Sequence, residues 1–100
     1  MKLCTLLFLL TVLIFSAAAA LAYKGEQLAP QAKVTLDQAR AIALKAVPGT
    51  ITDEELESER GGSGLRYSFD IKTGSTTHEV GVDALTGTLL ENSIEGARPD

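Results

Sequence analysis

The sequence predicts a small α+β domain in which one N-terminal amphipathic helix packs on an antiparallel meander sheet of three or four strands. The chain has 100 residues, a length that allows one small domain. Apolar residues recur at helical spacing between residues 35 and 47, whereas after residue 64 they alternate with polar residues at strand spacing. Short turn sequences separate the alternating segments, so we expect consecutive strands to pair as neighbours.

The first 22 residues have the features of a cleaved export signal. Lys2 precedes an apolar run from Leu3 to Phe15, and residues 20–22 (Ala-Leu-Ala) match an A-x-A cleavage pattern. A helix of this apolar length reaches about 20 Å, which is less than the roughly 30 Å hydrocarbon core of a membrane. We therefore expect cleavage after Ala22 and an exported product, periplasmic or secreted, that does not span the membrane. An uncleaved N-terminal anchor is the alternative.

Composition argues against several classes of protein. Residues 23–100 carry eight basic side chains against thirteen acidic ones, a net charge of −5. A negative domain without a basic stripe argues against nucleic acid and anionic membrane surfaces as partners. The single cysteine, Cys4, lies inside the signal, so an apolar core must stabilise the exported domain without disulfides. A homodimer or another partner that covers more apolar surface would add stability. We expect no cofactor.

The helix follows a segment without periodicity. Residues 23–33 mix Gly, Glu, Gln, Pro and Lys, and we expect a flexible leader there. Thr35 and Gln38 have the spacing of a capping box, which predicts that a helix begins at this point. Residues 48–49 (Pro-Gly) end it. The expected buried stripe consists of Ala39, Ile42, Ala43, Ala46 and Val47.

Residues 50–60 contain conflicting signals. Their acidic composition and a second capping-box spacing, from Thr52 to Glu55, favour a helix. However, Ile51 and Leu56 are the only large apolar residues, so a helix here would have no apolar stripe. As an edge strand, the segment would use its acidic side chains to discourage unwanted pairing. The residues alone leave both structures open.

Beyond the Gly-rich turn at residues 61–64, the period changes to two. Residues 65–72 and 77–84 predict two half-buried strands, residues 83–87 a turn, and residues 88–92 a last short strand. We expect residues 95–100 to form a frayed tail. The large residues expected in the core are Leu36, Ile42, Val47, Leu56, Leu65, Tyr67, Phe69, Ile71, Val80, Val82 and Leu90.

In this order, the segments resemble the PepSY domain family. The resemblance is carried by the T-x-x-x-A helix of residues 34–49 that ends at Pro-Gly, by residues 67–71, and by the V-x-V-D-x-x-T-G pattern of residues 80–87. It covers about residues 33–92. The resemblance implies that residues 50–60 form a strand and that residues 34–94 form a PepSY-like domain.

The resemblance also implies a function, namely that of a free-standing, exported module that binds and regulates another protein. PepSY domains occur in propeptides of secreted metallopeptidases and are thought to restrain or modulate peptidases. The implied partner is therefore an extracytoplasmic protein such as a metallopeptidase. The family is not defined by catalytic residues, so we expect no enzyme and no catalytic site.

Acidic residues of the 53–59 segment are the candidate partner-binding residues. On a strand, Asp53, Glu55, Glu57 and Glu59 would give a patch complementary to a basic surface. The alternative is a domain that binds a small ligand or cation through the same segment, although Ca²⁺ requires several oxygens that converge on one point. A solvated acidic edge is the plainest interpretation. We interpret His78, the single histidine, as a packing residue and expect no metal site.

Overall fold

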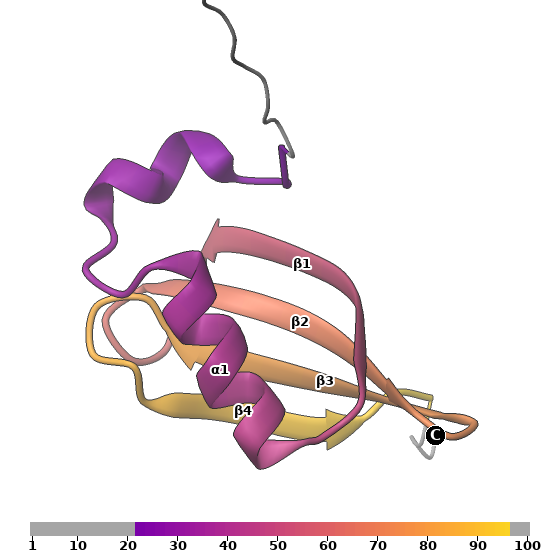
Figure 1. Ribbon diagram of the computed structural model, residues 1–100. Coiled ribbons are helices and arrows are strands. Elements are labelled where there is room, and N and C mark those ends of the chain that lie inside the picture. The colour runs from indigo at the N-terminus through magenta and orange to yellow at the C-terminus, as the bar shows by residue number, and fades with distance from the viewer. Residues whose placement is uncertain (1–21, 97–100) are drawn as a thin grey trace, which may run out of the picture.

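The computed structural model describes residues 22–96, which form one α-helix, one 3-10 helix and a four-stranded antiparallel sheet (Figure 1). The strand order β1-β2-β3-β4 is a meander, so the predicted α+β fold is confirmed. Residues 1–21, with the expected signal, and residues 97–100, with most of the expected tail, lie outside the described residues. The elements are η1 (Glu26–Gln31), α1 (Leu36–Ala46), β1 (Thr50–Ser58), β2 (Leu65–Thr73), β3 (Thr76–Asp83) and β4 (Leu89–Ile94).

Helix α1 begins at the predicted capping box. The Gln38 amide donates to Thr35 Oγ1 at 3.1 Å, and the Thr35 amide donates to Gln38 Oε1 at 2.9 Å. Ala39 and Ala43 are fully buried, and their small side chains let the helix lie close against β2 and β3. Because residue 48 is proline, the preceding Val47 is extended and the helix ends.

The core lies between α1 and one face of the sheet. Eight of the eleven large residues expected in the core are buried there, while Leu36 and Ile42 are half-buried and pack against it. The Tyr67 hydroxyl donates to the Val34 carbonyl at 2.6 Å and thereby joins β2 to the start of the helix. The buried hydrophobic residues are Ala39, Ala43, Val47, Leu56, Leu65, Tyr67, Phe69, Ile71, Val80, Val82 and Ala84.

Leu90 is the expected core residue that the structure places elsewhere. Gly81 pairs with Glu91, but a β-bulge makes Val82 pair with Leu89 rather than with Leu90. One extra residue moves the following side chains to the other face of the sheet. Leu89 therefore lies opposite Val82, whereas Leu90 lies against the turn at Gly62. The prediction of a core Leu90 is wrong because strict alternation does not include a bulge.

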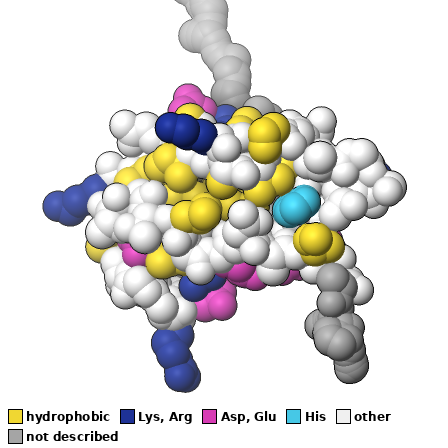
Figure 2. Space-filling model, turned by 90° about the horizontal axis from the view of Figure 1, so that it is seen from below, with side chains coloured by type: hydrophobic (Ala, Val, Ile, Leu, Met, Phe, Trp, Pro, Cys, Tyr) yellow, Lys and Arg dark blue, Asp and Glu magenta, His cyan; other side chains and the backbone are white. Residues whose placement is uncertain are grey.

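The helix side of β4 is only partly covered, because α1 packs mainly on β2 and β3. Leu89 and Ile94 remain 40% and 50% exposed. Figure 2, which views the molecule from the side of β4, shows apolar side chains gathered in the middle of this surface, with His78 beside them. No helix within residues 22–96 has the length and the apolar character needed to cross a bilayer.

The leader of residues 23–33 differs from the expectation of a flexible arm, because it forms η1 and lies along β1. The Leu56 amide donates to the Lys24 carbonyl at 2.9 Å, which gives one parallel bridge at the edge of the sheet. Gly25 permits this approach, since its φ is +90° and a Cβ there would lie 1.7 Å from the Leu56 carbonyl oxygen. The 3-10 helix has six residues, which is too short to show a period in the sequence.

Candidate functional site

Most of the acidic side chains gather on the side of the sheet that faces away from α1. Strand alternation sends Phe69 into the core and sends its neighbour Asp70 to the opposite side. Asp70 pairs with Asp53 on one neighbouring strand and with Glu79 on the other. We call this surface the acidic face and define it by Asp53, Glu55, Glu57, Glu59, Asp70, Glu79, Glu91 and Glu95.

The acidic face contains a groove of about 360 Å³. All four of the candidate residues from the sequence, Asp53, Glu55, Glu57 and Glu59, line this groove. Their shared position follows from their spacing of two residues, because Asp53, Glu55 and Glu57 alternate along β1 and Glu59 directly follows it. The structure therefore brings the candidate residues together on one surface, where their negative charges add.

Sequence reasoning missed the other half of the acidic face. Asp70, Glu79 and Glu91 also line the groove, and they come from β2, β3 and β4. Each of them is an isolated carboxylate in its own strand and belongs to no acidic run. Alternation combined with the meander order was the signal that would have placed them beside Asp53, because neighbouring strands align outward positions.

Some carboxylates of the acidic face have polar partners. Ser68 Oγ donates to Glu57 at 2.6 Å, and Arg66 Nη1 lies 3.4 Å from Glu91 Oε1. Lys24 Nζ lies 3.7 Å from Glu55, but the lysine side chain is 84% exposed, so this pair contributes little. The acidic face holds eight of the thirteen acidic residues of the chain and remains strongly negative.

Three carboxylates of the acidic face lie close together. One oxygen from each of Asp70, Glu79 and Glu95 lies within 4.8 Å of the others. Burial raises the pKa of the Asp70 carboxyl, and the charges of Glu95 and Asp53 raise it further. This cluster is the best place on the acidic face for a cation, although Ca²⁺ needs more oxygen ligands than three carboxylates supply singly. It lies on β2, β3 and the end of β4, and not on the 53–59 segment.

A different carboxylate, Asp83, is used to build the fold. It is 1% exposed and accepts hydrogen bonds from the Ser63 amide at 2.7 Å, Ser63 Oγ at 2.8 Å, the Leu85 amide at 2.8 Å and the Thr86 amide at 3.1 Å. Burial acts to raise its pKa, but these four hydrogen bonds outweigh burial and lower the pKa to about 2. The aspartate of the V-x-V-D-x-x-T-G pattern therefore joins two turns and is not free to bind a partner.

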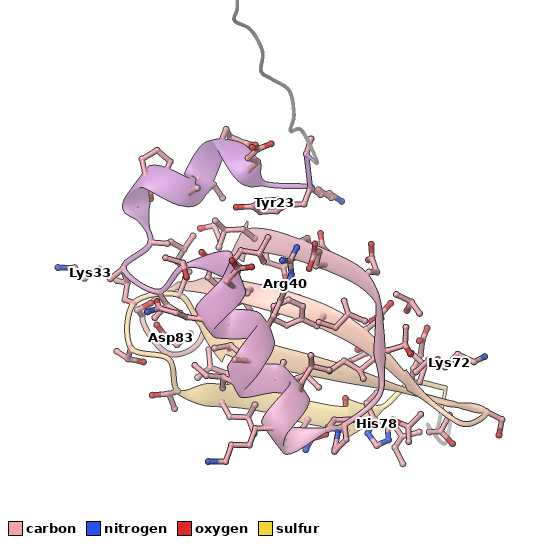
Figure 3. The ribbon with its side chains drawn as sticks, in the orientation of Figure 1. Tyr23, Lys33, Arg40, Lys72, His78 and Asp83 are labelled. Atoms are coloured by element: carbon pink, nitrogen blue, oxygen red, sulfur yellow. The ribbon has the colours of Figure 1, made fainter. Side chains whose placement is uncertain are left out.

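Glu54 shows how strictly alternation separates the two sides of the sheet. It lies between Asp53 and Glu55 but on the helix side, where it accepts from Arg40 Nε at 2.9 Å and Nη2 at 2.7 Å. This paired geometry raises the pKa of the guanidinium further above its ordinary value. Figure 3 shows Arg40 between α1 and β1, near Tyr23. Glu54 therefore joins β1 to α1 through its ion pair with Arg40 and does not belong to the acidic face.

His78 lies on the helix side of β3, near the end of α1 (Figure 3). It is half-buried, and its Nδ1 is buried without a hydrogen-bond partner among residues 22–96. A catalytic imidazole is held by an acceptor on one nitrogen while the other faces the nucleophile. Among residues 22–96, no acceptor holds the buried nitrogen of His78 in this way.

Comparison with known families gives one match. The model of the PepSY family, described as peptidase propeptide and YPEB domain, matches residues 33–92. The matched range contains α1, the first three strands, most of β4 and all of the groove-lining carboxylates. No curated protein and no solved structure matches the chain.

Proposed function

The chain belongs to the PepSY family, and from this membership we propose that it is an exported, non-catalytic module that binds and regulates an extracytoplasmic protein. PepSY is a propeptide and regulatory type of domain, generally non-catalytic, and its members are typically extracytoplasmic. A metallopeptidase is the first partner to test, because the family description links these domains to peptidase propeptides.

The acidic face is the observation that supports binding by this chain. Eight carboxylates share one surface, six of them on the four strands and two, Glu59 and Glu95, directly after β1 and β4, and a groove runs across this surface. A partner with a basic surface would be steered toward this face, and opposite charges would set its orientation. The proposed contacts are Asp53, Glu55 and Glu57 on β1 and Glu59 directly after it, and Asp70 continues the surface on β2.

Capture from an extracytoplasmic extract of the source cells tests this proposal. The exported chain would be compared with a variant that carries Glu55→Gln, Glu57→Gln and Asp70→Asn. The variant should retain less partner, and high salt should release the partner from the wild-type chain, because both changes weaken the attraction between opposite charges. Glu26→Gln is the matched control, since Glu26 is exposed on η1 and lies away from the acidic face.

Any captured peptidase would then be assayed with rising amounts of the chain. Dose-dependent inhibition would support a regulatory role on peptidases. Equal capture by the wild type and the triple variant would show that the acidic face is not the binding surface. If the wild-type chain retained no protein, the proposed function would be wrong.

Cation binding is the second candidate function, and the cluster of Asp70, Glu79 and Glu95 is the observation that favours it. A cation that binds the folded state raises its melting temperature. A melting temperature that does not change in millimolar Ca²⁺, Mg²⁺ or Zn²⁺ would remove this candidate. A rise that Asp70→Asn abolishes would support it.

A further inference from the structure

The two edge strands of the sheet, β1 and β4, differ in whether their outward backbone groups have a partner. Along β1, the Leu56 amide donates to the Lys24 carbonyl, so the preceding segment covers this edge. Along β4, no further strand pairs among residues 22–96, and β4 forms the lower edge of the sheet in Figure 1. The sheet therefore has one edge that its own chain partly covers and one edge that is open.

The direction of the backbone groups on β4 follows from its pairing with β3. The Glu95 amide donates to the Thr77 carbonyl at 2.8 Å, so these two residues are a hydrogen-bonded pair of the ladder. Such pairs alternate along antiparallel strands, which places Ser93 among the residues that bond to β3. The amides and carbonyls of Asn92 and Ile94 consequently point out of the sheet, toward the open edge.

The side chains on the two sides of this edge differ in character. On the helix side, Leu89 and Ile94 are 40% and 50% exposed. On the other side, Glu91 and Glu95 belong to the acidic face. A strand that added to this edge would thus meet apolar side chains on one side and carboxylates on the other.

We propose that the open edge of β4 binds an extended segment of the partner protein in which apolar and basic side chains alternate. The segment adds as a further strand and pairs with the backbone groups of Asn92 and Ile94. Its apolar side chains cover Leu89 and Ile94, and its basic side chains lie beside Glu91 on the acidic face. This inference rests on the proposed function, since it describes how the partner is recognised.

Charge favours such a partner over a second copy of the chain. Antiparallel pairing of two β4 strands about a two-fold axis would place Glu91 and Glu95 of both copies on one face of the joined sheet. Like charges on neighbouring strands destabilise their pairing, and acidic side chains on an edge strand commonly prevent self-association. A basic segment converts the same carboxylates into favourable contacts.

The direct test is a titration of the full isotope-labelled chain with a blocked peptide of alternating valine and lysine. We expect the amide signals of residues 89–94 to shift, and the binding to weaken as salt is added. One control peptide has the same residues with all lysines grouped at one end, and a second has glutamate in place of lysine. Both controls should bind roughly tenfold more weakly or worse, because they lose the alternation or the opposite charge. Equal binding of the three peptides would overturn the proposal.

Asn92→Pro tests the backbone pairing itself. Proline removes the outward amide of residue 92 but leaves the hydrogen bonds between β3 and β4, whereas the control Asn92→Ala retains that amide. We expect Asn92→Pro to bind the peptide roughly tenfold more weakly and Asn92→Ala to bind it as the wild type does. If Asn92→Pro does not fold, the double variant Leu89→Lys, Ile94→Lys replaces it, because both side chains are exposed and the added charges repel the lysines.

Several outcomes separate this inference from the proposed function. If Asn92→Pro still captures the partner and the acidic-face triple variant does not, the edge proposal is wrong and the proposed function stands. If the wild-type chain binds the peptide at residues 89–94 but captures no protein, the edge proposal stands and the proposed function is wrong. A wild-type dimer that Asn92→Pro dissociates would make a second copy the occupant and would overturn the proposal.

Discussion

Two aspartates in neighbouring parts of the sheet affect stability in opposite directions when they are ionised. Asp83 is buried and accepts four hydrogen bonds, so its charged form is stabilised and its pKa is lowered to about 2. Asp70 lies on the acidic face, where burial and two neighbouring carboxylates raise its pKa. The same side chain therefore stabilises the structure in one place and opposes folding in the other. The aspartate in the recognisable motif thus has a structural role, whereas an isolated aspartate belongs to the candidate binding surface.

The largest expected effect is the loss of the Asp83 carboxylate. Asp83→Ala leaves the Ser63 hydroxyl and three amides without their acceptor in a buried place, so we expect a loss of about 3 kcal/mol in the free energy of unfolding. Denaturant unfolding of the purified chain measures this loss. Asp37→Ala, at an exposed site on α1, is the control and should cost about 0.5 kcal/mol or less. Equal losses for both variants would contradict the structural role of Asp83.

The second prediction concerns acid. The folded pKa of Asp83 lies below its ordinary value of 3.8, so its stabilisation is complete above that value and is lost as pH falls through about 2. Ionised Asp83 should therefore add about 2 kcal/mol to the free energy of unfolding above pH 3.8, and this addition should disappear as the pH falls below about 2. Unfolding measured from pH 5 to pH 2 checks it, with Asp83→Asn as the variant that lacks this titration. A wild type and variant with parallel pH profiles would show that another group controls acid stability.

Ionisation of Asp70 should lower the free energy of unfolding, whereas ionisation of Asp83 raises it. Its folded pKa is raised, so ionisation at neutral pH weakens the folded state and protonation relieves this effect. Asp70→Asn should therefore raise the free energy of unfolding at pH 7 by about 0.5 kcal/mol, and the gain should shrink as pH falls through the folded pKa. Thermal melts at several pH values measure the gain. A destabilised Asp70→Asn would mean that the carboxylate is paired favourably.

The smallest expected effect is that of salt. Moderate salt screens the repulsion among the carboxylates of the acidic face, so it should stabilise the wild type by a few tenths of a kcal/mol. The triple variant Glu55→Gln, Glu57→Gln, Asp70→Asn should gain less, whereas Glu26→Gln should gain as much as the wild type. Melting curves with and without sodium chloride compare the three proteins. An equal gain in the triple variant would show that the acidic face is not repulsive.

The parts of the fold that depend on neighbours in the sequence were predictable. The capping box at Thr35 and Gln38, the alternation of residues 65–72, and the turn at Asp83 all involve residues a few positions apart. These local interactions have a recognisable spacing, and the structure confirms them. The strand at residues 50–58 was ambiguous locally, and the family resemblance identified it correctly.

The parts that depend on how strands meet were not predictable. The bulge opposite Val82 leaves no mark in the sequence, so Leu90 was assigned to the core face. The bridge between Lys24 and Glu55 joins segments about thirty positions apart, and the sequence therefore suggested a free leader. The half of the acidic face that includes Asp70 and Glu79 could have been predicted, but only by combining the alternation of each strand with the meander order, because these residues come together when β2 and β3 pair.

The bridge at Lys24 gives the site of proteolytic processing a structural consequence. Cleavage after Ala22, as the sequence predicts, would leave Tyr23 as the first residue and would keep the strand partner of Leu56. Cleavage three residues later would remove Lys24 and Gly25, and the Leu56 amide at the edge of β1 would then lose its backbone partner. A domain with two open edges can add a neighbour at each of them and grow into a fibre, whereas a domain with one open edge cannot extend beyond a single partner. The choice made by the processing peptidase would thus decide between a discrete binding module and a fibre-forming one.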